Sequence, residues 1–233
     1  MKSRLIKYFD VMEKYPQLFE NKESPTLKVI KDIVTIQEKE SELKKRLSEK
    51  GLPEEYADIG VLVDDPYFLI VRDLAEFPNG DVRGYIRFIN KASLKNAQAV
   101  AILPVYNNKI VLIRNFRHAT RNWEIEIPRG FGEDGFSPED NAKKELFEET
   151  GLTPIRILKL GSLNTDTAAR SPPVILFYAE VSKPKTISFD ANELISDILL
   201  LNQKDFEQMI KNEKITDGFT ISSYCMAKIL GLL

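Results

Sequence analysis

The sequence of 233 residues has little of the chemistry that depends on cysteine or histidine. It contains one cysteine, Cys225, and one histidine, His118. A single cysteine excludes an internal disulfide and a cysteine-based zinc cluster, and a single histidine excludes a histidine-rich metal site. We expect no functional role for His118 and a core position on an apolar C-terminal helix for Cys225. Catalysis, if present, must therefore depend on carboxylates and basic side chains.

Long apolar runs and an excess of charge are also absent. The longest apolar stretches, such as residues 99–104 and 174–179, are far shorter than the ~18 residues of a membrane-spanning helix. The N-terminus lacks the apolar core of a signal peptide. Lysine and arginine number 33 against 35 acidic residues, which removes any broad attraction to nucleic acid. The sequence thus predicts a globular cytoplasmic protein without nucleic-acid or membrane partners.

The first fifty residues predict helices. Ser24-Pro25 is typical of a helix start, and Gly51 is typical of a helix end. A heptad-like apolar seam, interrupted at Glu40, runs between them through Val29, Ile33, Ile36, Leu43 and Leu47. Residues 5–19 form another amphipathic stretch, which we expect to pack against this helix. We interpret the pair as a helical hairpin lying on its own domain, with a dimerisation arm as the alternative.

From Asp58 onwards the pattern changes to strands and hairpins. Pro78-Asn79-Gly80 is the strongest hairpin signal, and a second turn is expected at Asn107-Asn108. Strands are predicted at residues 67–73, 82–90, 98–106, 109–116, 123–127, 155–163, 174–181 and 194–201, and helices at 138–150, 204–212 and 219–230. Hairpins mixed with well-separated helices predict an α+β fold with a mixed sheet. We therefore divide the chain into a helical extension, 1–57, and a domain, 58–233, made of an antiparallel strand region, 58–96, and a core, 97–233.

A glycine-rich loop followed by a helix is the most informative segment. Gly130, Gly132 and Gly135 allow the backbone to turn sharply and to approach a ligand closely. Ser137-Pro138 is typical of a helix start, and Gly151 is typical of its end. The segment therefore predicts a loop that bends back over a capped helix.

Three glutamates on this helix share one face. Glu145, Glu148 and Glu149 occupy positions i, i+3 and i+4, where like charges repel one another. On its own such a pattern usually marks a solvated face. Here Leu146 and Leu152 bury the opposite side, and the glycine-rich loop lies over the carboxylates. Clustered carboxylates beside open backbone carbonyls suit a hard cation such as Mg²⁺, which polarises phosphoryl oxygens and activates water.

The segment resembles the Nudix box, G-x5-E-x7-R-E-U-x-E-E-x-G-U, in which U is a bulky aliphatic residue. The matches need no insertion or deletion and comprise Gly130, Glu145, Leu146, Glu148, Glu149, Gly151 and Leu152. Phe136 stands in place of the first glutamate of the pattern, and Lys144 stands in place of the arginine. Lys144 can still pair with Glu148 one turn later, although it lacks the bidentate fork of arginine. In the family, the glutamate that Phe136 replaces often helps to organise the metal site.

The resemblance extends over residues 58–233, to the ADP-ribose pyrophosphatase branch of the Nudix hydrolases. It is carried by residues 99–105, 111–117, 126–130 and 210–220. It implies a Nudix-type α/β/α sandwich with a mixed sheet, preceded by a β-hairpin region that helps to build a homodimer. It implies nothing about the helices before Asp58.

The resemblance also assigns roles to the box residues. Glu145, Glu148 and Glu149 would hold Mg²⁺, with Mn²⁺ as a possible substitute, and Glu148 would also take part in catalysis. The backbone carbonyl of Arg129 would be a further ligand, although the family usually has alanine at this position. Gly130, Lys144 and Gly151 would be structural members of the motif.

Three arginines are candidates for binding the substrate. Arg117 would hold the diphosphate, since a planar guanidinium suits phosphate oxygens. Arg114 is the weaker candidate, because residues 114 and 117 of a strand point to opposite faces. A surface salt bridge is the alternative for either residue. Arg170 lies in the loop 164–173, which departs from the branch pattern, and could reach a phosphate or a sugar.

The general base and the adenine platform are less sharply defined. In this branch the base often comes from an acidic loop after the box, so Glu193 is the candidate and Asp166 the alternative; an ordinary exposed acid is the other interpretation. Trp123, Phe116 and Tyr85 are candidate platforms for adenine, although a core position is the more common place for such side chains.

The function implied is hydrolysis of the diphosphate bond of a nucleoside diphosphate linked to another moiety. ADP-ribose, which would give AMP and ribose 5-phosphate, is the expected substrate. The altered loop 164–173 keeps open another nucleotide sugar, such as GDP-mannose, or a dinucleotide. Because Phe136 stands in place of the first glutamate of the pattern, a weakly active domain that binds ADP-ribose as a sensor is a further alternative. Retention of three mutually repelling carboxylates favours an active enzyme.

Overall fold

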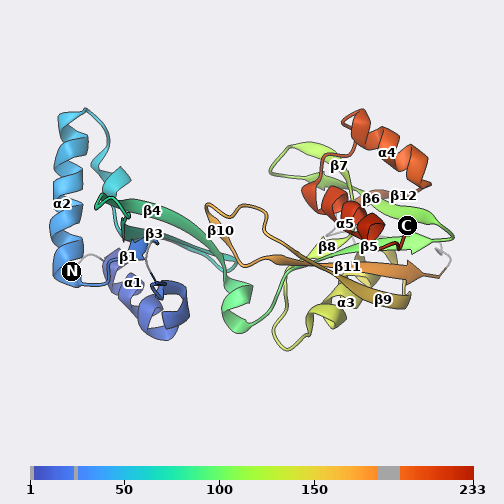
Figure 1. Cartoon of the computed structure of the whole chain (residues 1–233), viewed down its shortest axis with the longest axis horizontal. Helices are drawn as coiled ribbons and strands as arrows, with labels where there is room; N and C mark the ends of the chain where they lie inside the picture. The colour runs from blue at the N-terminus through green and yellow to red at the C-terminus, as the bar shows by residue number, and fades with distance from the viewer. Residues whose placement is uncertain (1–2, 24–25, 183–194) are drawn as a thin grey trace. The chain divides into compact units, whose positions relative to one another are not determined.

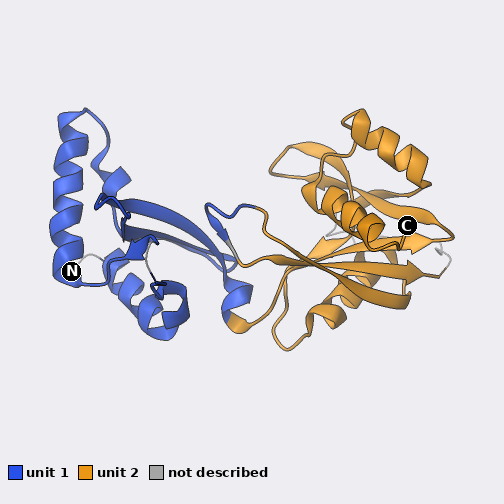
Figure 2. Ribbon diagram, in the orientation of Figure 1, with its two compact units in different colours: residues 1–94, 166–171 blue, residues 95–165, 172–233 orange. Residues whose placement is uncertain are grey.

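The computed structural model describes residues 3–23, 26–182 and 195–233, which form two compact units (Figure 2). Unit 1 comprises Met1–Leu94 and Asp166–Ser171, and unit 2 comprises Lys95–Thr165 and Pro172–Leu233. The short segment Asp166–Ser171 therefore belongs to the first unit although both of its neighbours in the sequence belong to the second.

Unit 1 is built on a sheet whose long strands form the predicted hairpin. The described strands of this sheet are β1 (Lys28–Val29), β2 (Gly60–Asp64), β3 (Phe68–Glu76), β4 (Val82–Asn90) and β10 (Arg170–Ser171). Both β1 and β2 pair antiparallel with β3, and β10 pairs parallel with β4. The hairpin closes where Gly80 N donates to Phe77 O at 2.9 Å, with Gly80 at φ +84°. This left-handed backbone explains why glycine ends the turn signal.

The helices of unit 1 pack on its own sheet. They are α1 (Ser3–Lys14), η1 (Pro16–Phe19), α2 (Ile33–Glu49), η2 (Glu54–Ala57) and η3 (Lys91–Lys95), the last residue of which belongs to unit 2. Leu5 of α1 and Ile36 of α2 are buried in one cluster with Val71 of β3 and Ile89 of β4. Of the apolar seam, Ile36 is therefore buried within this unit, and Val29 and Leu43 pack against the same cluster.

The long helix begins later than the sequence predicted. It starts at Ile33, where the carboxylate of Asp32 accepts a hydrogen bond from Thr35 N at 2.7 Å. Lys28 and Val29 instead pair with the end of β3. A residue in an extended ladder cannot also form helical hydrogen bonds, so the helix is shorter than expected. The proposed start at Ser24-Pro25 lies outside the described residues.

Two buried carboxylates connect the helices to the sheet. Asp73 accepts hydrogen bonds from Tyr8 Oη at 2.6 Å and Arg87 Nη2 at 3.0 Å. Burial, reinforced by the negative charge of Asp73, raises the pKa of Tyr8 well above its usual value. Glu40 pairs with Arg4 and accepts from Ile59 N at 3.1 Å. The charged interruption of the seam is thus a buried ion pair and not a solvated gap.

Unit 2 is a mixed sheet between two helical layers. Its described strands are β5 (Val100–Tyr106), β6 (Lys109–Arg117), β7 (Asn122–Glu126), β8 (Arg129–Gly130), β9 (Pro154–Leu163), β11 (Val174–Val181) and β12 (Ile195–Leu201). Strand β11 is parallel to β5, and the other pairs are antiparallel. Helix α3 (Pro138–Thr150) covers one face, and α4 (Gln203–Lys211) and α5 (Gly218–Ile229) cover the other (Figure 1). The predicted α/β/α sandwich with a mixed sheet is confirmed.

The C-terminal helix corrects one expectation from the sequence. Cys225 is exposed and not part of the core. The buried stripe of α5 runs through Thr220, Ser223, Tyr224 and Ala227, at helical spacing, and position 225 falls beside it. Within the described parts of the chain, no helix is both long and apolar enough to cross a membrane.

The Tyr8–Asp73 contact gives a test of the helix–sheet packing in unit 1. We expect Tyr8→Phe to lower the free energy of unfolding by about 1–3 kcal/mol, because it removes a donor from a buried carboxylate. Tyr56→Phe is the matched control, since Tyr56 is 60% exposed. Urea unfolding followed by circular dichroism measures both changes. Equal stability of the two variants would contradict this packing.

Candidate functional site

The helix that carries the three glutamates is fixed at both ends. Ser137 Oγ accepts a hydrogen bond from Asp140 N at 3.1 Å, and Pro138 occupies the first turn. Gly151 ends α3 with φ +64°, and its N–H donates to Phe147 O at 2.7 Å. Leu146 is fully buried against the sheet. The predicted caps are confirmed, and together with this packing they set which face of α3 the glutamates occupy.

Gly130 allows the carboxylate of Glu145 to lie against the backbone of β8. A Cβ atom on residue 130 would overlap the Cδ and both carboxylate oxygens of Glu145. Any other residue here would push that side chain away. Gly130 is therefore needed for this position of the Glu145 carboxylate, whereas at Gly135 glycine is favoured by a left-handed backbone, φ +84°.

A second carboxylate reaches the adjacent residue of the same short strand. Glu149 is 6% exposed, and its Oε2 accepts a hydrogen bond from Arg129 N at 3.0 Å. Glu145 and Glu149 are one helical turn apart and so lie on the same side of α3. The two carboxylates therefore meet the backbone of β8 at neighbouring residues, Arg129 and Gly130.

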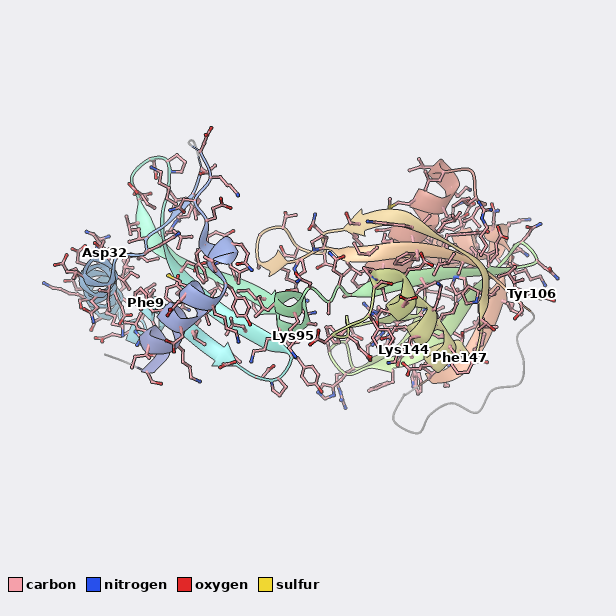
Figure 3. All side chains as sticks on the ribbon, turned by 90° about the horizontal axis from the view of Figure 1, so that it is seen from below. Phe9, Asp32, Lys95, Tyr106, Lys144 and Phe147 are labelled. Carbon is pink, nitrogen blue, oxygen red and sulfur yellow. The ribbon has the colours of Figure 1, made fainter. Side chains whose placement is uncertain are left out.

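The third glutamate of the box pairs with lysine. Lys144 Nζ lies 3.1 Å from Glu148 Oε2 and 2.5 Å from Glu133 Oε1 (Lys144 is labelled in Figure 3). The hydrogen bond to Glu133, followed by that to Glu148, raises the pKa of Lys144 above its usual value. The expected Lys144–Glu148 pair is confirmed. Glu133 was not identified from the sequence, because nothing in its spacing relates it to the helix.

The donor set at β8 fits a hard divalent cation. Over residues 3–23, 26–182 and 195–233, no three Asp, Glu, His or Cys side chains are grouped as a ready metal site. The carboxylate of Glu145 lies against Gly130, and that of Glu149 accepts a hydrogen bond from the neighbouring Arg129 N. Mg²⁺ is commonly bound through one or two carboxylates, with water and substrate phosphates completing its shell. The arrangement therefore suits a cation that substrate helps to hold.

A fully buried glutamate holds two arginines beside this strand. Glu126 ends β7 and has no exposed surface. It pairs with Arg117, and its carboxylate also accepts from Arg129 Nη2 at 3.0 Å and Asn115 Nδ2 at 3.3 Å. Glu126 belongs to the segment 126–130 that carries the family resemblance, and its spacing in the sequence does not indicate this pairing. A carboxylate buried this deeply stays charged only when such partners compensate it. The same pairing restricts the positions that the guanidinium groups of Arg117 and Arg129 can adopt.

The two guanidinium groups also keep unused donors. The Nε atoms of Arg117 and Arg129 are buried and have no hydrogen-bond partner among the described residues. Arg129 lies over the ring of Phe219, 4.8 Å from its centroid, and its Nη2 is 3.5 Å from Asp217 Oδ1. Asp217 caps α5, whose Thr220 Oγ1 accepts from Ile127 N at 3.0 Å. The start of α5 is therefore tied to the segment that enters the box.

Arg114 and Arg117 lie on opposite faces of β6, as expected. Arg114 is exposed and lies over Trp123, 5.4 Å from the ring centroid. Trp123 packs edge to face on Phe116, with 5.6 Å between centroids. Because side chains alternate along β6, these residues lie on the face opposite to Arg117. Exposed His118 contacts Arg121, with 2.7 Å between Nδ1 and Nη1.

The remaining candidates lie in unit 1 or outside the described residues. The guanidinium of Arg170 is 5.9 Å from the ring centroid of Phe88, and Arg170 N donates to Asp166 O at 2.8 Å. Tyr85 Oη donates to Ala168 O at 2.7 Å. These contacts attach the segment 166–171 to β4. Glu193, the candidate base, lies outside the described residues.

Comparisons with known proteins agree with this geometry. A family model described as the NUDIX domain matches residues 95–215, more than half of the chain. The chain is 29% identical over 180 residues to the ADP-ribose pyrophosphatase of Bacillus subtilis (strain 168), covering 76% of this chain and 90% of that protein. It is also 29% identical over 152 residues to the methanol dehydrogenase activator of Bacillus methanolicus, covering 64% and 78%.

A solved structure shows the same fold. The crystal structure of an ADP compounds hydrolase matches with a TM-score of 0.64 at 20% identity, covering 74% of this chain and 91% of that chain. The matched family segment contains the loop, the capped helix and the carboxylates that meet at β8. From this match and this geometry we conclude that the chain belongs to the NUDIX family and is a Nudix hydrolase.

Proposed function

We propose that this Nudix hydrolase cleaves the diphosphate of ADP-ribose, releasing AMP and ribose 5-phosphate, with Mg²⁺ or Mn²⁺ as its cofactor. One observation carries the proposal: Glu145 and Glu149 meet at β8 beside the buried Glu126, which holds Arg117. A diphosphate is negatively charged, so a site with two carboxylates that can hold a cation, next to an arginine held in place, suits it. The choice of ADP-ribose is supported by the similarity to the Bacillus subtilis enzyme.

Glu145 and Glu149 would hold the cation, with the carbonyl of Arg129 as a further ligand. When bound, a divalent cation polarises a phosphoryl oxygen and makes water a stronger nucleophile. Arg129 N fixes the direction of the Glu149 carboxylate, and Gly130 leaves room for that of Glu145. Such prior positioning matters, because phosphoryl transfer depends mainly on geometry and charge stabilisation. Glu148 would share the metal site while Lys144 restrains it.

Arg117 would bind the diphosphate. Its pairing with Glu126 holds the guanidinium in place before substrate arrives, which reduces the entropy lost on binding. We also retain Glu193 as the proposed general base, with Asp166 as the alternative. The homodimer and the cytoplasmic location stay predictions from the sequence.

The substrate assignment is tested by AMP release from ADP-ribose. We expect release with Mg²⁺, loss of release with a chelator, and faster turnover of ADP-ribose than of GDP-mannose or dinucleotides. If another compound of the panel is hydrolysed faster, ADP-ribose is not the preferred substrate, but metal-dependent hydrolysis of the diphosphate bond still holds. If no compound is hydrolysed while ADP-ribose still raises the unfolding temperature, the proposed hydrolysis is contradicted and the protein binds ADP-ribose as a sensor.

The metal assignment is tested by Glu149→Gln. A neutral amide is a poor ligand for a hard cation, so we expect metal-dependent turnover to fall by more than the roughly 10- to 100-fold typical of changes behind the ligands. Glu139→Gln, on an exposed part of the same helix, is the control. Steady-state rates across Mg²⁺ concentrations measure the effect, and circular dichroism checks the fold. Wild-type activity in Glu149→Gln would refute the site.

The diphosphate assignment is tested by Arg117→Lys. Lysine keeps the charge but lacks the planar fork, so we expect KM for ADP-ribose to rise about tenfold, the equivalent of one lost charged hydrogen bond. The dependence on Mg²⁺ should stay unchanged. Arg114→Lys is the matched control, because it makes the same exchange on the opposite face of β6. An equal KM in the two variants is the result that excludes Arg117 from substrate binding.

A further inference from the structure

Glu133 and Phe136 are the two ends of one tight turn in the loop that precedes α3. Phe136 N donates to Glu133 O at 3.3 Å, and Gly135 within the turn has φ +84°. The first and fourth residues of such a turn lie within about 7 Å of each other, measured between Cα atoms. Side chains from either end can therefore reach the same part of a neighbouring helix.

The loop that contains this turn is held at several points. Asn141 Nδ2, on α3, donates to Phe131 O at 3.0 Å. A Cβ on Gly132 would overlap the backbone of Ala97 and Gln98, so the loop lies directly against that segment. Ser137 then caps the helix. These contacts hold both flanks of the turn, and the ion pair between Glu133 and Lys144 places it beside α3.

The two ends of the turn differ in what they present. Phe136 is 44% exposed and brings no charge to a position where the family pattern has glutamate. Glu133 instead lies 2.5 Å from Lys144, which also pairs with Glu148 at 3.1 Å. A carboxylate, a lysine and a box glutamate are thus joined in one chain of ion pairs.

We propose that Glu133 is a positioning residue that replaces the acidic residue missing at position 136. Through Lys144 it holds the loop against α3 and restrains Glu148 beside the metal-binding pair. Glu133 itself touches neither metal nor substrate. This inference rests on the proposed function, because it concerns the order of the same metal site.

The test measures binding of Mn²⁺ alone to the full chain, by the electron paramagnetic resonance signal of free Mn²⁺. We expect Glu133→Gln to weaken binding about tenfold, as is typical when a group that orients a ligand is lost. The unfolding temperature without metal should hardly change, because a half-exposed ion pair contributes little stability. Glu139→Gln is the matched control: it removes the 2.7 Å pair with Lys143 on the same helix and should leave binding unchanged.

A rescue variant tests the equivalence of the two ends of the turn. Adding Phe136→Glu to Glu133→Gln should restore Mn²⁺ binding to within about twofold of wild type, since the new carboxylate can reach Lys144 from the other end. Glu133→Gln that binds Mn²⁺ as tightly as Glu139→Gln, or a double variant that stays weak, would overturn the proposal. A wild-type chain that binds Mn²⁺ but hydrolyses no nucleoside diphosphate would contradict the proposed function alone.

Discussion

The close approach of two carboxylates to the backbone of β8 is the constraint on which the site depends. Glu145 fits there because residue 130 has no side chain, and Glu149 is fixed by the N–H of Arg129. The caps of α3 and the buried Leu146 fix the helix, and so they fix the side of it from which both carboxylates reach β8.

A network of buried charge extends from this point into the rest of unit 2. Glu126 pairs with Arg117, the residue proposed to bind the diphosphate, and with Arg129, which in turn reaches Asp217 at the cap of α5. Arginine at position 129, where the family usually has alanine, therefore joins the entry to the box with the C-terminal helix. Unit 1 uses the same principle with Asp73 and Glu40, whose partners come from helices and strands distant in sequence.

Local patterns predicted the parts of the fold that local forces determine. The caps at Ser137 and Gly151 define α3, and the Pro78-Asn79-Gly80 signal marks the hairpin. Features that depend on tertiary contacts were not predicted. They are the strand β1, which takes the place of the expected first turns of α2, the two-residue strands β8 and β10, and the exposed position of Cys225. The box glutamates were found by their spacing, whereas Glu133 and the role of Glu126 depend on a turn and on burial that spacing does not encode.

Glu145 and Glu149 are proposed to form the metal site at β8. The most direct measurement is anomalous diffraction at the manganese edge from crystals of the full chain soaked in Mn²⁺. We expect a peak between the carboxylates of Glu145 and Glu149, next to the backbone of Arg129. A peak elsewhere, or none while Mn²⁺ still supports turnover, would contradict this assignment.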